Sequence, residues 1–375
     1  MPKTHPPRGP RGLPFWLLWL TASCTPKPEG PVAEVSSEVR REPRPSQVDA
    51  AHTNDALDAA QARPATAAAP DAAGDESLDV QGLLALGPAR STSLGSPMDG
   101  SLLGGVPLPW EGPGFRYNPR RRPEARFGTV EMVQALARAA AKVQRRYPDA
   151  RLTINDLGFA RGGPISQHGS HQSGRDVDVL FFLRDAKRKI AEPIGVPIDP
   201  KGRGIDFGDL SDPRDDRPLR IDLPRTWALL QALIEDPESK LQRVFVAEHL
   251  RRMLLDYAEK SRAPRAVIDA FADRSCQPEA PHDDHFHFRF FCSPDDIRAG
   301  CEDTFPLYPW RRAELEAAGV QAKMAGKRRN KLPFALKSTE AAKREAGAMH
   351  AKVKAFLKER ESWAKKPHPG RAYCP

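Results

Sequence analysis

The stretch His285-Phe-His-Phe-Arg-Phe290 alternates polar with aromatic side chains, as a β-strand does when one of its faces enters a core. A second stretch, Asp176-Val-Asp-Val-Leu-Phe-Phe182, begins with the same alternation. Successive side chains of a strand point to opposite faces, so the histidines and aspartates would line one face and Phe286, Phe288 and the valines the other. The two stretches therefore predict two strands of a sheet that has a polar face.

Five of the ten histidines fall in two short segments, residues 168–171 and 282–287. Imidazole and carboxylate are side chains that a zinc-like divalent ion accepts. If the two strands are neighbours, they present Asp178, His285 and His287 to one ion, and the Gly-containing loop before Asp176 supplies His171. Each short motif alone is more often ordinary polar alternation. Together they predict a metal site, either catalytic or structural.

Six residues separate His171 from Asp178 within Ser-His-Gln-Ser-Gly-Arg-Asp-Val-Asp178, and His282 begins a His-x-x-His-x-His pattern. These motifs resemble those of the penicillin-insensitive murein endopeptidases, in the wider group of zinc peptidases that includes lysostaphin and the D-Ala-D-Ala carboxypeptidases. The resemblance extends from about Ser91 to Asp303. It includes Ser93-Leu-Gly-Ser96, Gly104-Gly105, Arg126-Phe-Gly128, Asp156-Leu-Gly158, Gly162-Gly163, Val244-Phe-Val246 and the segment from Cys292 to Cys301.

The resemblance assigns a role to most of the clustered residues. It implies that His171, Asp178 and His287 bind one zinc ion, and that His285 and His282 are catalytic histidines beside the ion. Three protein ligands leave a fourth tetrahedral position for water, as in catalytic zinc sites. Zinc lowers the pKa of such a water to about 7, and a histidine that is not a ligand can transfer protons and stabilise an oxyanion.

Other residues of the motifs have less defined roles. The resemblance implies that His168 lies behind a ligand or near the substrate. Asp176 is either an acceptor that orients a ligand imidazole or a solvated acid at a strand end. The chain departs from the family at Arg175, where an apolar residue is usual, and Asp283-Asp284 fill the gap between two site histidines. Their negative charge would raise the pKa of neighbouring histidines.

For the function, the resemblance implies a zinc metallopeptidase that hydrolyses D-alanyl–meso-diaminopimelyl cross-links of peptidoglycan in cell-wall remodelling. Two alternatives stay open. One is a D,D-carboxypeptidase or dipeptidase that acts on uncross-linked stems, and the other is a cell-wall-binding lipoprotein that keeps zinc without turnover. The presence of all three expected ligands together with His285 favours an enzyme.

The N-terminus has the order of an export signal. Basic residues such as Lys3 and Arg8 precede the apolar stretch 13–20, which is too short to span a membrane and is typical of a signal peptide. It ends in Thr-Ala-Ser-Cys24, which looks like a lipoprotein cleavage box, although Thr21 stands where leucine is usual. We expect residues 1–24 to be a signal peptide, Cys24 to be lipidated, and the protein to lie in the periplasm, tethered to the envelope membrane.

Composition divides the rest of the chain. Residues 25–90 are rich in Ala, Pro, Ser and acidic residues, which predicts a disordered tether. The zinc peptidase domain would cover residues 91–303 and a basic helical tail residues 304–375. Within the domain we expect helices from Thr129 to Tyr147, from Thr226 to Ile234 and up to Leu254, strands at 150–155 and 243–247, and a long loop from Lys187 to Asp215. This mixture predicts an α+β fold, a small, mainly antiparallel sheet flanked by helices with the zinc site on the sheet.

Besides Cys24 there are four cysteines, an even number that is typical of disulfides in an exported protein. The resembled family has a closely spaced pair at the positions of Cys292 and Cys301. If these two are bonded, Cys276 is left to pair with Cys374, although four cysteines permit three connectivities.

The tail has seventeen Lys or Arg and six Asp or Glu, whereas the whole chain has a net charge of +9. Residues from Ser338 to Trp363 are helix-prone, with Met349, Val353 and Phe356 as a narrow apolar stripe. The tail either binds anionic surfaces such as peptidoglycan carboxylates or lipid head groups, or packs on the domain. The expected bond of Cys374 favours packing. Peptidoglycan is the expected partner, and nucleic acid is not one for an exported protein.

Overall fold

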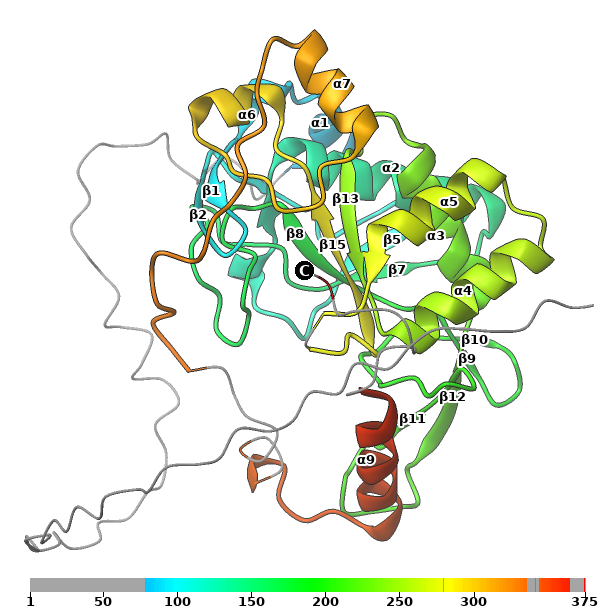
Figure 1. The fold of residues 1–375 in the computed structure, drawn as a ribbon. Coiled ribbons are helices and arrows are strands. Elements are labelled where there is room, and N and C mark those ends of the chain that lie inside the picture. Colours follow the sequence, from blue (N-terminus) through cyan, green and yellow to red (C-terminus); the bar gives the residue numbers. More distant parts are fainter. Residues whose placement is uncertain (1–77, 279, 336–340, 342–343, 365–373, 375) are drawn as a thin grey trace, which may run out of the picture. The chain divides into compact units, whose positions relative to one another are not determined.

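The computed structural model describes residues 78–278, 280–335, 341, 344–364 and 374. The expected signal peptide with Cys24, and residues 25–77 of the expected tether, lie outside the described residues. Helices are combined with mainly antiparallel sheets, which confirms the predicted fold class (Figure 1). In the described ranges no helix is both long enough and apolar enough to cross a bilayer.

A seven-stranded sheet contains both stretches from which the prediction started. Its strand order is β14-β13-β15-β8-β7-β5-β4, and all neighbouring pairs are antiparallel except β13 with β14 and β5 with β7. The strands are β4 (Glu111–Gly112), β5 (Phe115–Tyr117), β7 (Leu152–Ile154), β8 (Asp176–Leu180), β13 (Leu241–Phe245), β14 (Ser275–Cys276) and β15 (His285–Phe290).

The two predicted strands, β8 and β15, lie side by side at the centre of this sheet. They are antiparallel, with His287 opposite Asp178 and Arg289 opposite Asp176. Their apolar side chains belong to the main core, and the rings of Phe181 and Phe286 meet edge to face at 4.8 Å. The alternation in the sequence therefore predicts correctly which side chains of the two strands lie on the polar face and which enter the core.

Helices pack against the apolar face of the sheet, so the polar face is left for the site (Figure 1). The predicted helix 129–147 is α2 (Val130–Arg146), with Thr129 as N-cap and Pro148 just beyond its C-cap. The other helices of this layer are α3 (Leu223–Glu235), α4 (Glu248–Lys260) and α5 (Arg265–Arg274). They confirm the helices expected from Thr226 and up to Leu254.

The expected long loop from Lys187 to Asp215 is wrong in part. It contains two strands of a four-stranded sheet with the order β10-β9-β12-β11, whose members are β9 (Leu183–Asp185), β10 (Ile190–Ala191), β11 (Arg203–Asp206) and β12 (Arg217–Ile221). These strands are short and half exposed, so they carry no clear alternation that the sequence could show. Two further pairs are β1 (Thr92–Ser96) with β2 (Asp99–Leu103) and β3 (Val106–Pro107) with β6 (Phe127–Gly128).

The folded part begins earlier than expected. Residues 78–90, assigned to the tether, contain α1 (Val80–Ala85), capped by the Asp79 carboxylate, and a 3-10 turn at Pro88–Arg90. Leu83 is fully buried, and Gln134 of α2 donates to its carbonyl and to that of Leu86, both at 2.9 Å. The composition of this segment gave no sign of these contacts because α2 supplies the partners.

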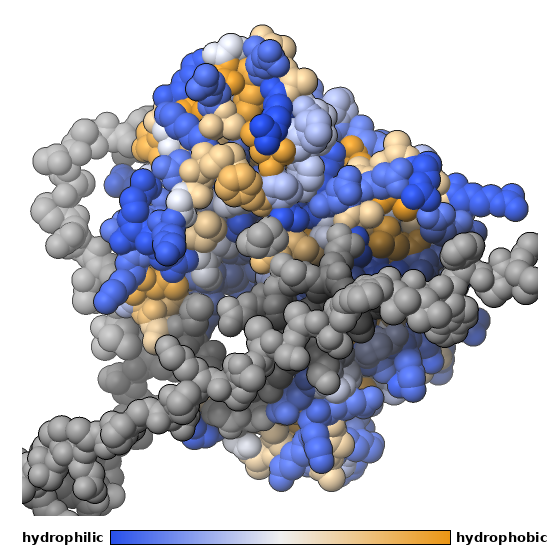
Figure 2. Space-filling model, in the orientation of Figure 1, coloured by the Kyte–Doolittle hydropathy of each residue, from blue (hydrophilic) through white to orange (hydrophobic). Residues whose placement is uncertain are grey.

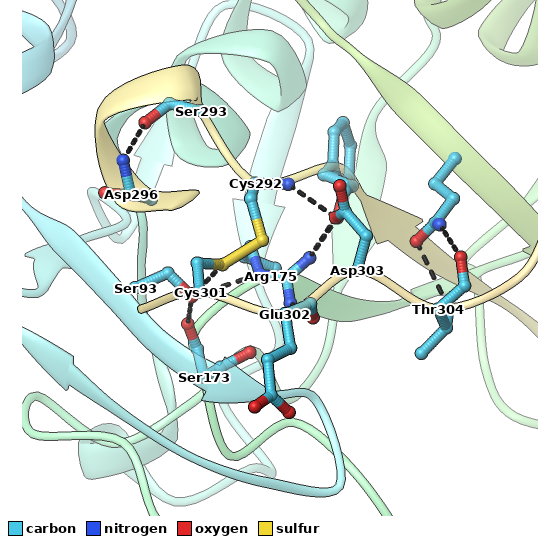
Figure 3. The surroundings of a disulfide bond; sticks show 12 residues. Ser93, Ser173, Arg175, Cys292, Ser293, Asp296, Cys301, Glu302, Asp303 and Thr304 are labelled. Atoms are coloured by element: carbon cyan, nitrogen blue, oxygen red, sulfur yellow. Dashed lines mark hydrogen bonds and ion pairs between the residues drawn. A yellow bond between two sulfur atoms is a disulfide. The ribbon is translucent and has the colours of Figure 1, made fainter. Parts of the chain in front are cut away.

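Both expected disulfides are present, Cys292–Cys301 and Cys276–Cys374. The first lies beside Arg175, the residue that departs from the family pattern (Figure 3). This fully buried guanidinium donates to the carbonyls of Phe290 and Glu302, each at 2.8 Å, and forms an ion pair with Asp303 at 3.2 Å. Arg175 therefore connects the start of β8 to the disulfide-bonded segment, and its buried charge has the partners that it requires.

The boundary expected at residue 303 is not a structural boundary. After α6 (Pro294–Ala299), the chain continues into α7 (Pro309–Ala317), whose Arg311 is fully buried and donates to the carbonyl of Cys292. The helix expected from Ser338 to Trp363 is interrupted: residues 341, 344 and 345 are helical, residues 346–350, where Gly347 has a positive φ of 72°, are not, and α9 (Ala351–Ala364) follows. Val353 and Trp363 are buried, so α9 packs on the domain, as one of the two interpretations of the tail required.

Several exposed residues of the tail are basic. Lys352, Lys354 and Lys358 of α9 are exposed, and the lower part of the surface, where α9 and β11 lie, is largely hydrophilic (Figure 2). Binding of this surface to peptidoglycan or lipid head groups stays a prediction.

Candidate metal centre

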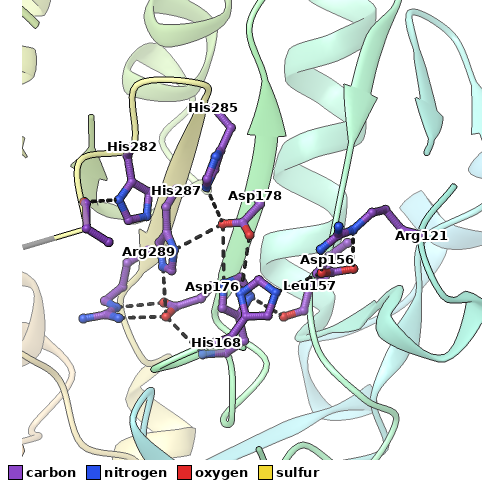
Figure 4. Close-up of polar contacts among 12 residues, drawn as sticks. Arg121, Asp156, Leu157, His168, Asp176, Asp178, His282, His285, His287 and Arg289 are labelled. Carbon is purple, nitrogen blue, oxygen red and sulfur yellow. Dashed lines mark hydrogen bonds and ion pairs between the residues drawn. The ribbon is translucent and has the colours of Figure 1, made fainter. Parts of the chain in front are cut away.

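Asp178 lies at the centre of a group of four histidines (Figure 4). Three ring nitrogens lie close to its Oδ1 atom: Nδ1 of His287 at 3.2 Å, Nε2 of His171 at 3.4 Å and Nε2 of His285 at 3.5 Å. Nδ1 of His168 lies 3.6 Å from the other oxygen, Oδ2. The structure therefore brings together the residues that the strands and the preceding loop were expected to supply.

Two facing polar atoms of this group are buried without a hydrogen bond. In the described part of the chain, Nε2 of His171 and Oδ1 of Asp178, which lie 3.4 Å apart, have no hydrogen-bond partner. Buried polar atoms nearly always have partners, so such a pair requires a specific explanation. A cation held between these side chains would provide one, since imidazole and carboxylate are its preferred ligands.

The backbone and a carbonyl orient His171. Its φ of 73° lies in the left-handed region, which is costly for a residue other than glycine and concentrates at functional sites. Nδ1 of His171 lies 2.7 Å from the carbonyl oxygen of Leu157, so Nδ1–H donates there and the lone pair of Nε2 is directed at Asp178. This is the usual support for a histidine that binds a metal through its other nitrogen.

Asp176 of β8 orients His287 and Arg289 of the neighbouring strand β15. Arg289 donates two hydrogen bonds to its carboxylate, at 2.8 and 2.7 Å, and Nε2 of His287 lies 3.1 Å from Oδ2 of the same carboxylate. Asp176 is fully buried, so the alternative of a solvated acid at the strand end is wrong. The paired charge of Arg289 keeps this aspartate ionised beside His287.

His285 and His282 lie at the edge of the group, toward the segment that precedes β15. Nδ1 of His285 lies 2.7 Å from Oδ1 of Asp284, which fixes the ring with Nε2 toward Asp178. His282, at a φ of 50°, has its Nδ1 2.6 Å from the carbonyl of Ala280, and its ring centroid lies 4.8 Å from that of His285. The sequence did not predict that Asp284 orients His285.

His168 is connected to an aspartate for which the sequence predicted no role. Its Nε2 lies 2.9 Å from Oδ2 of Asp156, whose carboxylate also accepts hydrogen bonds from Arg121. Asp156 lies in one of the segments that carry the family resemblance, so a signal for it existed. No feature of the sequence singled out Arg121, which reaches the site from a loop.

Charge and burial shift the pKa values of the central groups in opposite directions. Burial alone would raise the pKa of Asp178, but the positive charges of His171 and His285 hold it well below the usual value. Burial alone would lower the pKa of His285, but the carboxylates of Asp284 and Asp178 raise it well above the usual value. Of the two acids Asp283 and Asp284, the second therefore has the expected effect on a neighbouring histidine. His282 behaves in the opposite way, since burial and the charges of His285 and His287 lower its pKa.

Two overlapping sets of residues are candidates for a metal ion, one found in the structure and one expected from the sequence. The ligand atoms of His168, His171 and Asp178 all lie within 4.8 Å of one another. The set expected from the sequence has His287 in place of His168. In each of the three histidines the far ring nitrogen lies at an oxygen acceptor, which is Asp156 for His168, the carbonyl of Leu157 for His171 and Asp176 for His287. The near nitrogens of His171 and His287 lie 3.4 and 3.2 Å from Oδ1 of Asp178, whereas that of His168 lies 3.6 Å from Oδ2. Both sets can supply two imidazoles and one carboxylate, the chemistry of a zinc site with an open position.

Comparison with known proteins gives one consistent result. The model of a peptidase family described as penicillin-insensitive murein endopeptidase matches residues 93–331. A penicillin-insensitive murein endopeptidase of Pectobacterium atrosepticum is 28% identical over 229 residues, covering 60% of this chain and 73% of that protein. The proteins of the same name from Yersinia enterocolitica and Escherichia coli O157:H7 are 28% and 26% identical, over 60% and 59% of this chain and 75% and 73% of their own lengths.

Proposed function

This chain belongs to the penicillin-insensitive murein endopeptidase family, and on that premise we propose that it is a zinc-dependent peptidase that cuts D-alanyl–meso-diaminopimelyl cross-links of peptidoglycan. The observation that supports the proposal most directly is the facing pair of unpartnered atoms, Nε2 of His171 and Oδ1 of Asp178. Buried imidazole and carboxylate atoms that face one another without hydrogen bonds are arranged for a cation, and the family is one of peptidases.

We assign the zinc ligands to Nε2 of His171, Asp178 and Nδ1 of His287. The carbonyl of Leu157 supports His171, and Asp176 lies behind His287, so each imidazole has an oxygen acceptor on its far side. His168 lies behind Asp178 and, with Asp156, restrains the carboxylate. A bound zinc ion supplies a Lewis acid that polarises a carbonyl and lowers the pKa of a water molecule.

The remaining side chains have roles in proton transfer. Asp284 holds Nδ1 of His285, so that Nε2 faces the site, where the raised pKa keeps the ring protonated and able to give a proton to the leaving amine. His282 packs against the rings of His285 and His287. Its Nδ1–H is held by the carbonyl of Ala280, so its Nε2 can accept a hydrogen bond from the attacking water. In this proposal the chain has no serine nucleophile, so penicillin would not inhibit it.

Digestion of purified sacculi tests the proposal. We expect the protein to convert dimeric muropeptides into monomers, and we expect 1,10-phenanthroline to prevent this, with restoration by added zinc. Chromatography of the muropeptides before and after digestion is the measurement. Loss of pentapeptides with dimers intact would instead indicate a D,D-carboxypeptidase. No change in either, with zinc bound, would indicate a wall-binding protein without turnover.

We also propose that the protein is a periplasmic lipoprotein anchored through Cys24. The support is the order of basic, apolar and small residues that ends at this cysteine. In cells given labelled palmitate, the wild-type protein should incorporate label and the Cys24→Ser variant should not. Equal labelling of the two proteins would contradict lipidation at this cysteine.

A further inference from the structure

Asp283 lies in the segment between the site histidines His282 and His285, and its side chain is fully buried. Within the described ranges, all hydrogen bonds to its carboxylate come from α9. Arg360 donates through Nε to Oδ2 at 2.9 Å and through Nη2 to Oδ1 at 2.7 Å, and Nε1 of Trp363 donates to Oδ2 at 3.1 Å. A planar guanidinium that binds both oxygens fixes the orientation of a carboxylate as well as its charge.

The same segment is held from its other side by the backbone of the domain. The N–H of Ile198 donates to the carbonyl of Asp283 at 2.8 Å, and the N–H of Ala247 donates to the carbonyl of His282 at 3.1 Å. The residue after Asp283 is Asp284, which holds the ring of His285. The position of His285 therefore depends on a short segment that is fixed by the domain backbone on one side and by α9 on the other.

α9 is itself attached to the domain near both of its ends. Before its first residue, the N–H of His350 donates to the carbonyl of Leu210 at 2.9 Å. At its last residue, Ala364, the carbonyl accepts a hydrogen bond of 3.0 Å from Gln277, and beyond it Cys374 is bonded to Cys276. These attachments fix the helix where its Arg360 meets Asp283.

The buried charge of Asp283 requires its contact with Arg360. Without the guanidinium, the carboxylate of Asp283 would be a buried charge with no counter-ion, which is strongly unfavourable. The carboxylate would then either take up a proton, which ends its fixed orientation, or move toward water, and Asp284 and His285, the two residues that follow it, would move with it. Asp283 lies within the residues that the family model matches, whereas α9, which supplies its partners, lies beyond the end of the match at residue 331.

We propose that Arg360 and Trp363 are positioning residues that hold the His282–His285 segment in its reactive geometry through Asp283. The expected effect on turnover rests on the proposed function, whereas the effect on the segment itself does not. α9, which belongs to the tail of the chain, thus contributes to the geometry of the active site.

The test compares the full-length Arg360→Met variant with Lys358→Met, which removes a positive charge from the exposed side of the same helix. We expect Arg360→Met to lower kcat on dimeric muropeptides by about 10- to 100-fold with KM and zinc content unchanged. Amide hydrogen exchange in a peptide that covers residues 282–287 should become faster. Lys358→Met should match the wild type in both measurements. Arg360→Lys keeps the positive charge but lacks the planar guanidinium that binds both oxygens of Asp283. Its kcat and its exchange rate should therefore lie between those of Arg360→Met and the wild type.

A second pair of variants shows whether the effect passes through Asp283. Arg360→Met combined with Asp283→Asn removes the unpaired charge and should recover part of the lost kcat. If Arg360→Met does not fold, Trp363→Phe, which removes one hydrogen bond and keeps a ring, should show smaller shifts in the same direction.

The proposal would be overturned if the Arg360→Met variant had the kcat and the exchange rate of the wild type. If only Trp363→Phe folds, the same result in that variant would overturn it. Equal losses in Arg360→Met and Lys358→Met would also overturn it, because the effect would then be one of charge alone. If the wild-type protein does not hydrolyse muropeptides, the proposed function fails, and the exchange measurement alone decides the positioning role. Faster exchange then supports it and unchanged exchange contradicts it.

Discussion

Replacement of Asp178 or His287 by alanine should abolish both zinc binding and hydrolysis of peptidoglycan. Asp178 is approached by four imidazoles, and its Oδ1 atom is buried without a hydrogen bond in the described part of the chain. Loss of one of three protein ligands should weaken zinc binding by more than the roughly 10- to 100-fold that loss of a supporting residue costs. Zinc content by elemental analysis and digestion of sacculi are the two measurements.

The His168→Ala variant is the matched control for ligand identity. Because Nδ1 of His168 lies 3.6 Å from Oδ2 of Asp178, farther than the near nitrogens of His171 and His287 lie from Oδ1, we expect this variant to keep zinc and to lose only part of its activity. If His168→Ala loses zinc while His287→Ala keeps it, the ligand set is His168, His171 and Asp178 instead. The double variant Asp178→Ala/His287→Ala should be no less active than either single variant, since residues that act as one unit do not give additive losses.

The His285→Ala variant should keep its zinc and lose turnover. Asp284 holds the ring of His285 so that its Nε2 is directed at Asp178. Removal of a general acid or base typically costs about 10²- to 10⁴-fold in rate. The loss should appear in kcat, with KM and zinc content close to those of the wild type, because binding of the stem peptide does not require proton transfer. Single-turnover digestion of purified dimeric muropeptide provides the rate.

Asp284→Asn serves as the companion variant, since it keeps the shape of the side chain that orients His285 and removes its charge. We expect a smaller loss than for His285→Ala, because the ring stays present but is less firmly held. Loss of zinc from His285→Ala would show that His285 is a ligand and not a proton-transfer residue. Unchanged turnover in that variant would remove His285 from the mechanism altogether.

The sequence was sufficient to place the polar face of the central sheet. Strand parity is local: a period of two in β8 and β15 assigns each side chain to a face whatever the neighbouring strand is. The apolar residues of α2 likewise follow from a local period and from Pro148. The contacts of Asp178 with His171, His285 and His287 could be expected because the two strands pair directly and a short loop precedes one of them.

Where a segment depends on a distant partner, its structure is harder to predict from the sequence. Residues 78–90 have the composition of a tether, yet Leu83 is buried because α2 provides a surface for it. Strands β10 and β11 are too short and too exposed to show a period. Arg175, which stands where the resembled family usually has an apolar residue, is accommodated because Asp303 and two carbonyls lie in reach of its guanidinium.

By itself, then, the sequence determined which residues share the polar face and which chemistry they support, because alternation and residue type are local properties. The tertiary structure alone decided their partners: Arg289 on Asp176, Asp156 on His168, and Arg360 on Asp283. Each pair joins residues that are distant in sequence, and a buried charge selects its partner by proximity in the folded chain. Such proximity arises only when the strands, loops and α9 have packed together.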